Sequence, residues 1–467
     1  MLKRTDYLTR IYGKPEGWTL QVYEREMNGY EVARRVLASM TREEVVEEAK
    51  KANLRGRGGA GFPMGVKWSF MPKTVGPKPH YLVVNADEGE PGTHKDRTLM
   101  ELNPHACVEG CLIACYAMGA HVAYIYVRDE LHLSKARLEG AIAEARTKGY
   151  VGKKPFGKDF PIEVYVHSGA GAYICGEETS MLNSLEGRRG EPRMKPPFPA
   201  NAGAFGCPTT VNNLESIAAV PTMFGMGCEE FSKLSALHAI GDGGVRLYGL
   251  NGHVKKPGIV ELAVGPTLNE LIHDIGGGVL GGRPVLCVIP GGSSTPVLRP
   301  EEIVKAPDPK SPLHPYDGKS VFDVPLGVET MRLCGTMLGT CCVTVIAEGT
   351  DPLWCFQNLM QFYRHESCGQ CTPCREGSAW LERVTSKLLA GKGTIEELDE
   401  LHDIANGIMG NTICAFGEGT AMPALGFLKK FRKHFESYVL GTKKHEDATL
   451  LVAESAEGGS AQTATRG

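Results

Sequence analysis

The sequence has no strong excess of charge of one sign and no long apolar run. Its 51 Lys and Arg residues nearly balance 54 Asp and Glu residues, and the formal net charge is −3, so nothing marks the chain as a binder of nucleic acid or membrane surfaces. No apolar run approaches the roughly 18 to 20 residues of a membrane-spanning helix. The first residues, MLKRTDYLTRIYGKPEGW, have the character of neither a secretion signal nor an organelle transit peptide. We therefore expect a soluble protein of a bacterial cytoplasm.

The cysteines argue against a disulfide framework. The chain has 15 of them, an odd number in a long sequence without a secretory signal, which favours reduced thiols and metal ligands. At 467 residues the chain is too long for a single hydrophobic core, and about three domains are expected.

The first half of the sequence alternates strand-like and helix-like segments. Residues 41–53 predict a helix capped by Thr41, with Glu44 three positions later at the spacing of a capping box. Apolar runs then alternate with further helices. Strands are expected at 81–86, 121–127 and 162–167, and helices near 103–118 and 130–147. This alternation predicts a parallel sheet covered by helices.

The second half changes its pattern twice. From about residue 244, two strands, a short helix and another strand predict a compact α+β module of β-grasp type. Beyond Asp351, four helix-like stretches with short joints predict a helical bundle. We therefore divide the chain into an N-terminal segment with the glycine-rich loop (1–65), an α/β domain (66–235), a β-grasp domain (236–330), a helical bundle (331–440) and a disordered tail (441–467).

Three cysteines in SCGQCTPCREG form the clearest metal motif. Cys368, Cys371 and Cys374 have the spacing C-x2-C-x2-C, in which thiolates on a tight turn converge on one inorganic cluster. A ferredoxin would place another cysteine four residues after Cys374, but this position is Ser378. We choose Cys414, in the glycine-rich segment GNTICAFGEG, as the fourth ligand of a [4Fe–4S] cluster.

The other cysteines are weaker candidates. Cys355, Cys341 and Cys342 lie in apolar strand or helix contexts, and the adjacent pair is expected to be packing. A zinc site that includes His365 is the alternative to the cluster. Three further cysteines lie along one face of a predicted helix, where we expect buried packing residues rather than ligands: Cys107, Cys111 and Cys115.

A glycine-rich loop, GRGGAG, occupies residues 56–61. It matches the dinucleotide fingerprint G-x-G-x-x-G, which needs a strand before it and a helix after it. Here a charged helix precedes the loop and Phe62-Pro63 follow it, so that context is missing. The bare N–H groups of such a loop suit a phosphate or a planar ring, with Arg57 and Lys67 supplying positive charge.

Three polar clusters stand at expected strand ends or helix starts. Open α/β sheets bind ligands at the carboxyl ends of their strands, and carboxylates there suit ribityl or ribose hydroxyls rather than phosphates. Acidic residues at a helix start can also simply complement the helix dipole, whereas amides suit a phosphate or the edge of a heterocycle. The cluster at a strand end is Asn85, Asp87, Glu88 and Glu90, the cluster at a helix start is Gly176, Glu177 and Glu178, and the two amides are Asn212 and Asn213.

Six long motifs occur along the chain in the order NLRGRGGAGFPMGVKW, NADEGEPGTHKDR, GAYICGEETSMLNSLEG, CPTTVNNLESIAAVP, SCGQCTPCREG and NTICAFGEGTAMP. Together they closely resemble the family of the NADH-oxidising flavoprotein subunit of respiratory complex I, from about residue 10 to 440. The resemblance implies a Rossmann-like FMN-binding domain, a β-grasp domain of the soluble-ligand-binding type and a helical bundle with one [4Fe–4S] cluster.

The resemblance also implies roles for single residues. Positions near the reactive edge of the flavin match Glu88 and Glu178, the side chains expected to take part in the reaction. Positions that meet the nicotinamide nucleotide match Phe62, Phe70, Glu90, Glu178, Lys195 and Phe198. Positions that surround FMN match Gly56, Arg57, Gly58, Gly59, Ala60, Gly61, Lys67, Asn85, Asp87, Tyr173, Gly176, Glu177, Asn212 and Asn213.

The function implied by the resemblance is that of an NADH:quinone oxidoreductase subunit of the translocase class. NADH gives a hydride, two electrons at once, whereas a cluster accepts one electron, so FMN stands between them as a converter. Electrons then pass toward quinone. Expected partners are a small thioredoxin-like [2Fe–2S] subunit and a large multi-cluster subunit of complex I, in a peripheral arm on the cytoplasmic face of the bacterial inner membrane.

Two alternatives stay open at this point. One is the diaphorase subunit of a soluble NAD-dependent hydrogenase or formate dehydrogenase, which shares these motifs. The other is a non-enzymatic metal-binding scaffold that only recruits partners.

Overall fold

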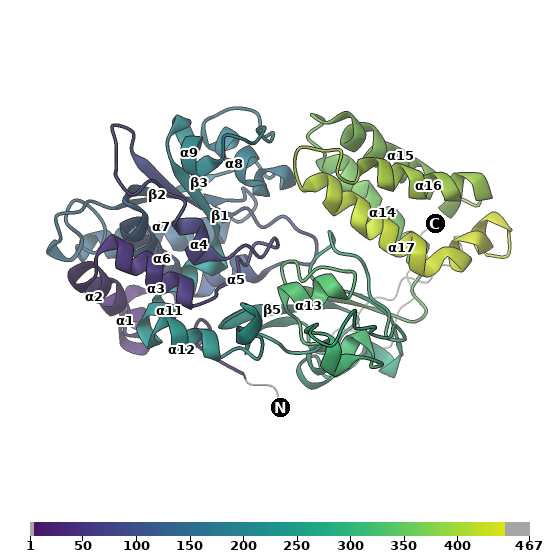
Figure 1. Cartoon of the computed structure of the whole chain (residues 1–467), viewed down its shortest axis with the longest axis horizontal. Helices are drawn as coiled ribbons and strands as arrows, with labels where there is room; N and C mark the ends of the chain where they lie inside the picture. The colour runs from purple at the N-terminus through teal and green to yellow at the C-terminus, as the bar shows by residue number, and fades with distance from the viewer. Residues whose placement is uncertain (1–3, 444–467) are drawn as a thin grey trace.

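The chain folds into three parts that follow its sequence order (Figure 1). The computed structural model describes residues 4–443, so the disordered tail expected at 441–467 lies, apart from its first three residues, outside the described residues. A helix-covered sheet comes first, a second sheet with short helices follows, and a helical bundle comes last. Within residues 4–443 no helix is both long and apolar enough to cross a membrane.

The N-terminal segment is helical and leads into the glycine loop. The predicted capping box is present, since Glu44 N donates to Thr41 Oγ1 at 3.3 Å and Thr41 N donates to the Glu44 carboxylate at 2.7 Å. These reciprocal bonds fix the start of the third helix. The helices are α1 (Leu20–Met27), α2 (Glu31–Ser39), α3 (Arg42–Lys51) and α4 (Met64–Trp68).

The first sheet is parallel throughout, as the alternation predicted. Its strand order is β3-β2-β1-β4, so β1 is central and β4 lies on its other side. Helices α6 and α7 pack against the sheet. The elements are β1 (His80–Ala86), α5 (Lys95–Leu102), α6 (Pro104–Met118), β2 (Ala120–Val127), α7 (His132–Thr147), β3 (Glu163–Ser168), α8 (Glu178–Leu185), α9 (Pro199–Ala202), β4 (Thr209–Asn213), α10 (Leu214–Ala218), α11 (Val220–Met226) and α12 (Cys228–Lys233).

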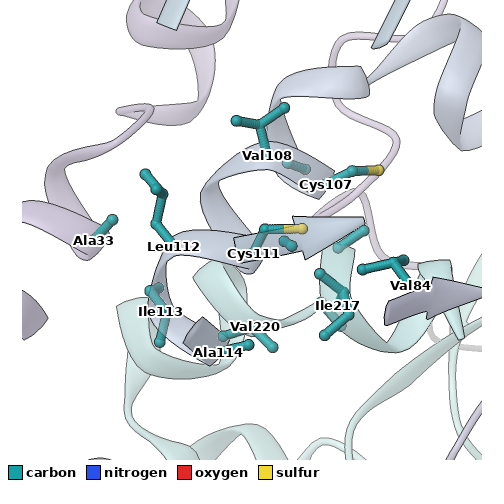
Figure 2. Close-up of a cluster of buried hydrophobic side chains, with 14 of the residues drawn as sticks. Ala33, Val84, Cys107, Val108, Cys111, Leu112, Ile113, Ala114, Ile217 and Val220 are labelled. Atoms are coloured by element: carbon teal, nitrogen blue, oxygen red, sulfur yellow. The ribbon is translucent and has the colours of Figure 1, made fainter. Parts of the chain in front are cut away.

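Helix α6 is buried on all sides, and its cysteines are packing residues, as predicted. Cys107, Cys111 and Cys115 are fully buried, and Figure 2 shows the first two among apolar neighbours that include Val84 and Ile217. Burial raises the pKa of all three thiols. They therefore stay neutral in the core of the first part.

The second sheet is mixed, with the strand order β6-β5-β8-β7. β5 and β8 are parallel, and the outer pairs are antiparallel. β8 lies beyond the range 236–330 that we expected for this domain. It belongs to this sheet because it pairs with β5, which is far away in the sequence. The elements are β5 (Val245–Gly252), β6 (Gly258–Ala263), the π-helix η5 (Glu270–Ile275), β7 (Val285–Ile289), α13 (Val328–Leu333) and β8 (Cys342–Ala347).

The last part is a bundle of four helices within the described chain, as predicted. Its core continues into both sheets, since Val83 of β1 and Cys287 of β7 belong to the same buried cluster as Phe356 and Phe427. The bundle is therefore packed onto the other two parts. Its helices are α14 (Pro352–Glu366), α15 (Thr372–Leu389), α16 (Ile395–Ile408) and α17 (Phe416–Val439).

Candidate functional site

The carboxyl ends of β1 and β4 meet where the strand order of the first sheet reverses. Val84 pairs with Asn212 and Asn85 with Asn213 in the parallel register of these strands. Ligands bind at such a switch point because the loops that leave the two strands run to opposite sides and leave a crevice. Two of the three predicted polar clusters therefore lie side by side.

The glycine loop, residues 56–61, packs against this edge and against the second part. A Cβ on Gly58 would come within 3.2 Å of Asn213 Cβ. Gly61 has a φ of +68°, and a Cβ there would come within 2.8 Å of Val328, so only glycine fits in both conformation and space. Gly59 forms a bridge with Gly339. α3 precedes the loop and α4 follows it. The structure therefore confirms that the loop is not preceded by the strand that the dinucleotide fingerprint requires.

Arg57 does not present its charge at this edge, contrary to the sequence-based expectation. Its side chain is 1% exposed, and its Nη2 donates to the carbonyl oxygens of Gly243 at 3.1 Å and Val245 at 2.7 Å. Its backbone N–H donates to Ser216 Oγ at 2.9 Å. Partners that are distant in the sequence thus turn the guanidinium inward, where it fastens the loop to the start of β5.

Asp87 is a buried carboxylate without an internal partner. Its side chain is 7% exposed, and within the described residues neither carboxylate oxygen has a hydrogen-bond partner. Burial raises the pKa of Asp87 to about 7, against the opposing charge of Arg128. A Cβ on Gly176 would lie 3.7 Å from Asp87 Oδ2. Because buried polar groups are nearly always paired, Asp87 is an acceptor for a donor that the chain does not supply.

The amides at this edge are held in fixed orientations. Asn85 Nδ2 donates to Gly176 O at 2.7 Å, and Trp68 Nε1 donates to Asn212 Oδ1 at 2.9 Å. Asn213 caps α10 through its Oδ1, and its Nδ2 donates to an Asp96 oxygen at 2.7 Å. Hydrogen bonds within the chain therefore orient all three amides at this edge.

Glu178, at the start of α8, is held between two lysines. Lys67 Nζ donates to its Oε2 at 2.9 Å and Lys195 Nζ to its Oε1 at 2.7 Å. Burial raises the pKa of Glu178, but the two lysines outweigh burial and lower the pKa below its ordinary value. The neighbouring Glu177 caps α8 with its side chain, so the helix-dipole interpretation applies to that residue.

Three exposed aromatic side chains stand near residues of the site in the sequence. Phe62 directly follows the glycine loop, Phe70 comes shortly after Lys67, and Phe198 comes shortly after Lys195. Phe62, Phe70 and Phe198 are 47%, 56% and 56% exposed, and the rings of Phe62 and Phe70 lie 5.9 Å apart. Aromatic rings that remain exposed next to a polar site are typical of a surface that stacks on a planar ligand.

Glu88 has a structural contact inside the site. It accepts hydrogen bonds from the backbone N–H groups of Asp96 and Arg97, at 2.8 Å each, where α5 begins. Burial, together with the negative charge of Asp96, raises its pKa. Glu88 therefore caps the start of α5, and its pKa of about 7 places its titration near neutral pH.

Glu90 is bound by three donors from two other segments. It accepts hydrogen bonds from Tyr173 OH, from Ser294 N at 2.7 Å and from Ser293 Oγ at 3.3 Å. The ring of Tyr173 lies 5.8 Å from that of Phe416, centroid to centroid. Glu90 and Tyr173 thus connect the loop after β1 with the second part and the bundle.

The four cysteines predicted to bind a cluster line one cavity where the bundle meets the first part. Cys371 immediately precedes α15, Cys374 lies in its first turn, and Cys414 lies just before α17. Ile413 N donates to Cys371 Sγ at 3.5 Å, which ties the Cys414 segment to the triplet. The lining residues are Ile174, Pro192, Cys368, Gln370, Cys371, Cys374, Thr412, Ile413, Cys414 and Phe416.

The alternative ligands lie elsewhere. Cys341 and Cys342 are fully buried in the second part, Cys355 does not line the cavity, and the His365 side chain is 85% exposed. Within residues 4–443 no group of three or more His, Cys, Asp or Glu side chains is placed to hold a single metal ion. Among the residues that the structure describes, the cavity is lined by four cysteines and by no histidine, which is the donor set of a [4Fe–4S] cluster.

The cavity is apolar enough to disfavour free thiolates. Burial raises the pKa of Cys374 to about 11 and that of Cys414 to about 12. Thiolates form in such surroundings only beside a strongly cationic group. The donor set therefore fits a metal cluster that brings its own positive charge.

One short segment touches both halves of the site. In the turn η2 (Tyr173–Gly176), Gly176 accepts from Asn85 and lies beside Asp87, while Ile174 lines the cysteine cavity. The edge of the first sheet near Asp87 and the cysteine cavity are thus neighbours.

Three stretches of the chain match family models. Residues 49–222 match the Nuo51 FMN-binding domain, 246–318 an SLBB domain, and 354–438 the NADH-ubiquinone oxidoreductase-F iron-sulfur binding region. The NADH-quinone oxidoreductase subunit designated F from Mycobacterium tuberculosis (strain H37Rv) is 44% identical over 442 residues, 94% of each chain. Its counterpart from Rhizobium meliloti, the second of two in that organism, is 45% identical over 432 residues, 92% of this chain and 97% of the relative. This chain belongs to the NADH-quinone oxidoreductase-F family.

Solved structures give the same fold at lower identity. NAD+-reducing [NiFe]-hydrogenase in the H2-reduced state superposes on this oxidoreductase-F chain with a TM-score of 0.76 at 31% identity, covering 90% of this chain and 66% of the hydrogenase chain. The air-oxidised state gives 0.74 at 29% identity, with 93% and 67% covered. The mixed α/β fold with a parallel sheet and a helical C-terminal region is thus common to both kinds of enzyme.

Sequence reasoning missed several residues of this oxidoreductase-F site. Lys95 Nζ lies 2.9 Å from both Asp96 and Glu215 in a buried group, next to the Asn213 amide. Ser293 and Ser294 hold Glu90 from the second part. Lys95 and Asp96 stand in the motif NADEGEPGTHKDR, which was a usable signal, but nothing in the sequence near 293 points to Glu90.

Proposed function

We propose that this chain oxidises NADH through FMN and passes the electrons singly to a [4Fe–4S] cluster, as the flavoprotein subunit of a respiratory NADH:quinone oxidoreductase. The observation that carries the proposal is the turn η2, which contacts Asp87 through Gly176 and lines the four-cysteine cavity through Ile174. A two-electron site and a one-electron site that share one short turn of chain suit a flavin that feeds a cluster.

FMN is proposed to bind at the carboxyl ends of β1 and β4. The unpartnered carboxylate of Asp87 suits ribityl hydroxyls, the glycine loop offers bare backbone to the ring or phosphate, and Lys67 supplies a cation. Arg57 contributes only by anchoring the loop. The proposed FMN contacts are Gly56, Gly58, Gly59, Ala60, Gly61, Lys67, Asn85, Asp87, Tyr173, Gly176, Glu177, Asn212 and Asn213.

NADH is proposed to lie against the exposed rings of Phe62, Phe70 and Phe198. Lys195 is half-buried and positive, which suits a pyrophosphate, and the carboxylates of Glu90 and Glu178 suit ribose hydroxyls or a carboxamide. Stacking plus these polar contacts would orient the nicotinamide, and orientation is the main requirement of hydride transfer.

The reaction asks little acid–base work of the protein. Bound FMN supplies the hydride acceptor and the conversion to single electrons. Glu178 is kept ionised by its two lysines, so its proposed role near the flavin is electrostatic. Glu88, with its raised pKa, is the side chain of the pair that can hold a proton near neutral pH.

The cluster is assigned to Cys368, Cys371, Cys374 and Cys414. We further propose the finer fold labels, a Rossmann-like FMN domain and a β-grasp domain. The partners proposed are the small thioredoxin-like [2Fe–2S] subunit and the large multi-cluster subunit of complex I, and the location proposed is the peripheral arm on the cytoplasmic face of the bacterial inner membrane. Membership in the oxidoreductase-F family supports assembly with other subunits.

Iron, sulfide and FMN contents of the purified chain, with an NADH:ferricyanide assay, test the proposal. We expect about four iron and four sulfide per FMN, and bleaching of the flavin bands by NADH. A colourless chain with zinc and without flavin contradicts it. Copurification with quinone-linked subunits separates this function from the hydrogenase diaphorase, which the 31% identity to a hydrogenase keeps as the second candidate.

A further inference from the structure

The loop that follows β1, residues 87–93, is gripped from the second part of the molecule. We propose that the second-sheet domain, residues 245–347, acts as a clamp that positions Glu90 in the nucleotide site, with Gly292 and Ser293 as positioning residues. This inference rests on the proposed role of Glu90 toward the nicotinamide nucleotide and adds a function for the domain that matches an SLBB model.

The first observation is the direction of the hydrogen bonds to Glu90. Its Oε1 accepts from Ser294 N at 2.7 Å and from Ser293 Oγ at 3.3 Å, while its Oε2 accepts from Tyr173 OH. A carboxylate has about four acceptor sites, so one remains, on Oε2. The clamp thus leaves Glu90 one lone pair, on the side of Tyr173, for a donor of the nucleotide.

The second observation is the space at Gly292. Its φ is +94°, and a Cβ there would lie 2.5 Å from Glu90 Cγ and 2.8 Å from Glu90 Oε1. Real Cβ atoms do not approach so closely, so the loop after β7 presses its bare backbone against the Glu90 side chain. Glycine at 292 therefore allows the contact that the two serines complete.

The third observation is that the clamp holds the rest of the loop as well. Asn251 Nδ2, at the end of β5, donates to Gly92 O at 2.5 Å. A Cβ on Gly92 would lie 2.8 Å from Thr344 Oγ1 of β8. The hydroxyls of Thr93 and Thr340 are 2.6 Å apart. Contacts from β5, β8 and two loops of the second part thus fix residues 90–93.

The clamp also reaches the bundle. Ser293 Oγ is 2.8 Å from Tyr363 OH of α14, and Glu366 of the same helix accepts from Tyr173 N at 3.0 Å. Ser293 therefore links Glu90 to α14, the helix that precedes the cysteine motif. The position of the Glu90 carboxylate depends on the docking of all three parts.

The test compares two glycine variants in the full chain with FMN and cluster bound. Gly292→Ala adds a methyl group at a positive φ against Glu90. Gly318→Ala adds one at a similar φ, +75°, in the same domain with nothing within 4 Å, and so controls for backbone strain. We expect Gly292→Ala to raise KM for NADH about tenfold or more, the size of a lost hydrogen bond to a charged group, with kcat within about twofold. Gly318→Ala should leave KM unchanged.

Coupling to Glu90 separates positioning from general damage. Glu90→Ala alone should raise KM, and adding Gly292→Ala to it should change KM no further, because the methyl group then has no carboxylate to displace. Ser293→Ala is the milder variant, with an expected rise in KM of about two- to tenfold. FMN content and the cluster's electron paramagnetic resonance signal should be unchanged in all five variants.

Three results would contradict the clamp or the role of Glu90 on which it rests. If Glu90→Ala raises KM but neither Gly292→Ala nor Ser293→Ala does, the clamp is refuted while the nucleotide role of Glu90 stands. If Glu90→Ala leaves KM unchanged, the proposed role of Glu90 in the nucleotide site is refuted, and the clamp loses the role on which it rests. A KM increase in Gly292→Ala that adds fully to that of Glu90→Ala also refutes the clamp, since the effect then bypasses the carboxylate.

Discussion

Replacing Asp87 by Asn should stabilise the FMN-free chain while it weakens FMN binding. The carboxylate is buried and has no hydrogen-bond partner among the described residues, so its charge is destabilising until a ligand arrives. Asn keeps the shape of the side chain and removes the charge. Opposite effects on stability and on binding are the signature of a group retained for a ligand.

The magnitude follows from the pKa, which burial raises from 3.8 to about 7. Below about pH 4 the folded and unfolded chains both carry the proton, and the carboxyl group costs nothing. As pH rises from about 4 to 7 the unfolded chain ionises first, so stability falls. One pKa unit is about 1.4 kcal/mol, so the cost is about 1.5 kcal/mol at pH 5 and about 4 kcal/mol at pH 8. Above the folded pKa the cost is constant.

The assay is urea unfolding of the FMN-free chain at pH 5 and pH 8. The stability difference, Asp87→Asn minus wild type, should become more positive by about 2–3 kcal/mol between the two values. A constant offset from the unpartnered amide does not affect this change. FMN titrations, followed by flavin fluorescence, should give a Kd about 10- to 100-fold higher, since hydrogen bonds to a charged group are lost.

Asp96→Asn is the matched control. The Asp96 carboxylate is also buried, but Lys95 and Asn213 bind it at 2.9 Å and 2.7 Å, so its loss should destabilise the FMN-free chain. If Asp87→Asn is less stable than wild type by the same amount at both pH values, Asp87 has an internal partner and the reasoning is wrong. An unchanged Kd for FMN refutes the placement of the ligand.

Three further outcomes are expected. Cys414→Ser should lower the iron content and abolish the cluster's electron paramagnetic resonance signal, whereas Cys355→Ser, outside the cavity, should keep both; equal iron in the two variants contradicts the ligand assignment. Lys195→Met removes one of the two cations that lower the pKa of Glu178, so kcat/KM for NADH should fall about tenfold and should decline further at acidic pH as Glu178 takes up a proton; a pH profile parallel to wild type counts against this. Asp351 caps α14 and accepts from Tyr438 OH at 2.6 Å; burial raises its pKa, but bonds from His434 and Tyr438 outweigh burial and hold the pKa well below its ordinary value. Asp351→Asn should therefore cost about 1–3 kcal/mol of unfolding free energy at pH 7, and the difference should shrink only below about pH 4; a difference that is the same at pH 3 and pH 7 is inconsistent with this account.

The fold was predictable where the pattern is local. Apolar runs mark the strands at 81–86, 121–127 and 162–167, and Thr41 and Glu44 mark the cap of α3. β4 was not recognised as a strand, because Thr209–Asn213 is mostly polar and becomes buried only by pairing with β1. β8 joins β5 across a long stretch of chain, so no local signal places it in the second sheet.

The sequence pointed to the residues that the structure brings together at this edge of the sheet more than to the orientations of their side chains. Asp87 and Glu90 follow a strand, and the carboxyl ends of strands are where such sheets bind ligands. Arg57 looked equally suited from its place in the glycine loop, yet it turns inward to Gly243 and Val245. The sequence holds the type of a side chain, whereas its direction depends on partners that only the folded chain brings near.

The distance between the two proposed redox sites is limited by covalent geometry. Ile174 lines the cysteine cavity, and Gly176, two residues on, lies beside Asp87. Because consecutive Cα atoms are about 3.8 Å apart, the walls of the two sites cannot be separated by more than about 8 Å at this segment. The hydrogen bond from Asn85 to Gly176 holds one end of the turn, and that from Tyr173 N to Glu366 holds the other. A turn pinned at both ends keeps the two walls at a constant separation, which an electron step between fixed sites requires and a protein that only recruits partners does not need.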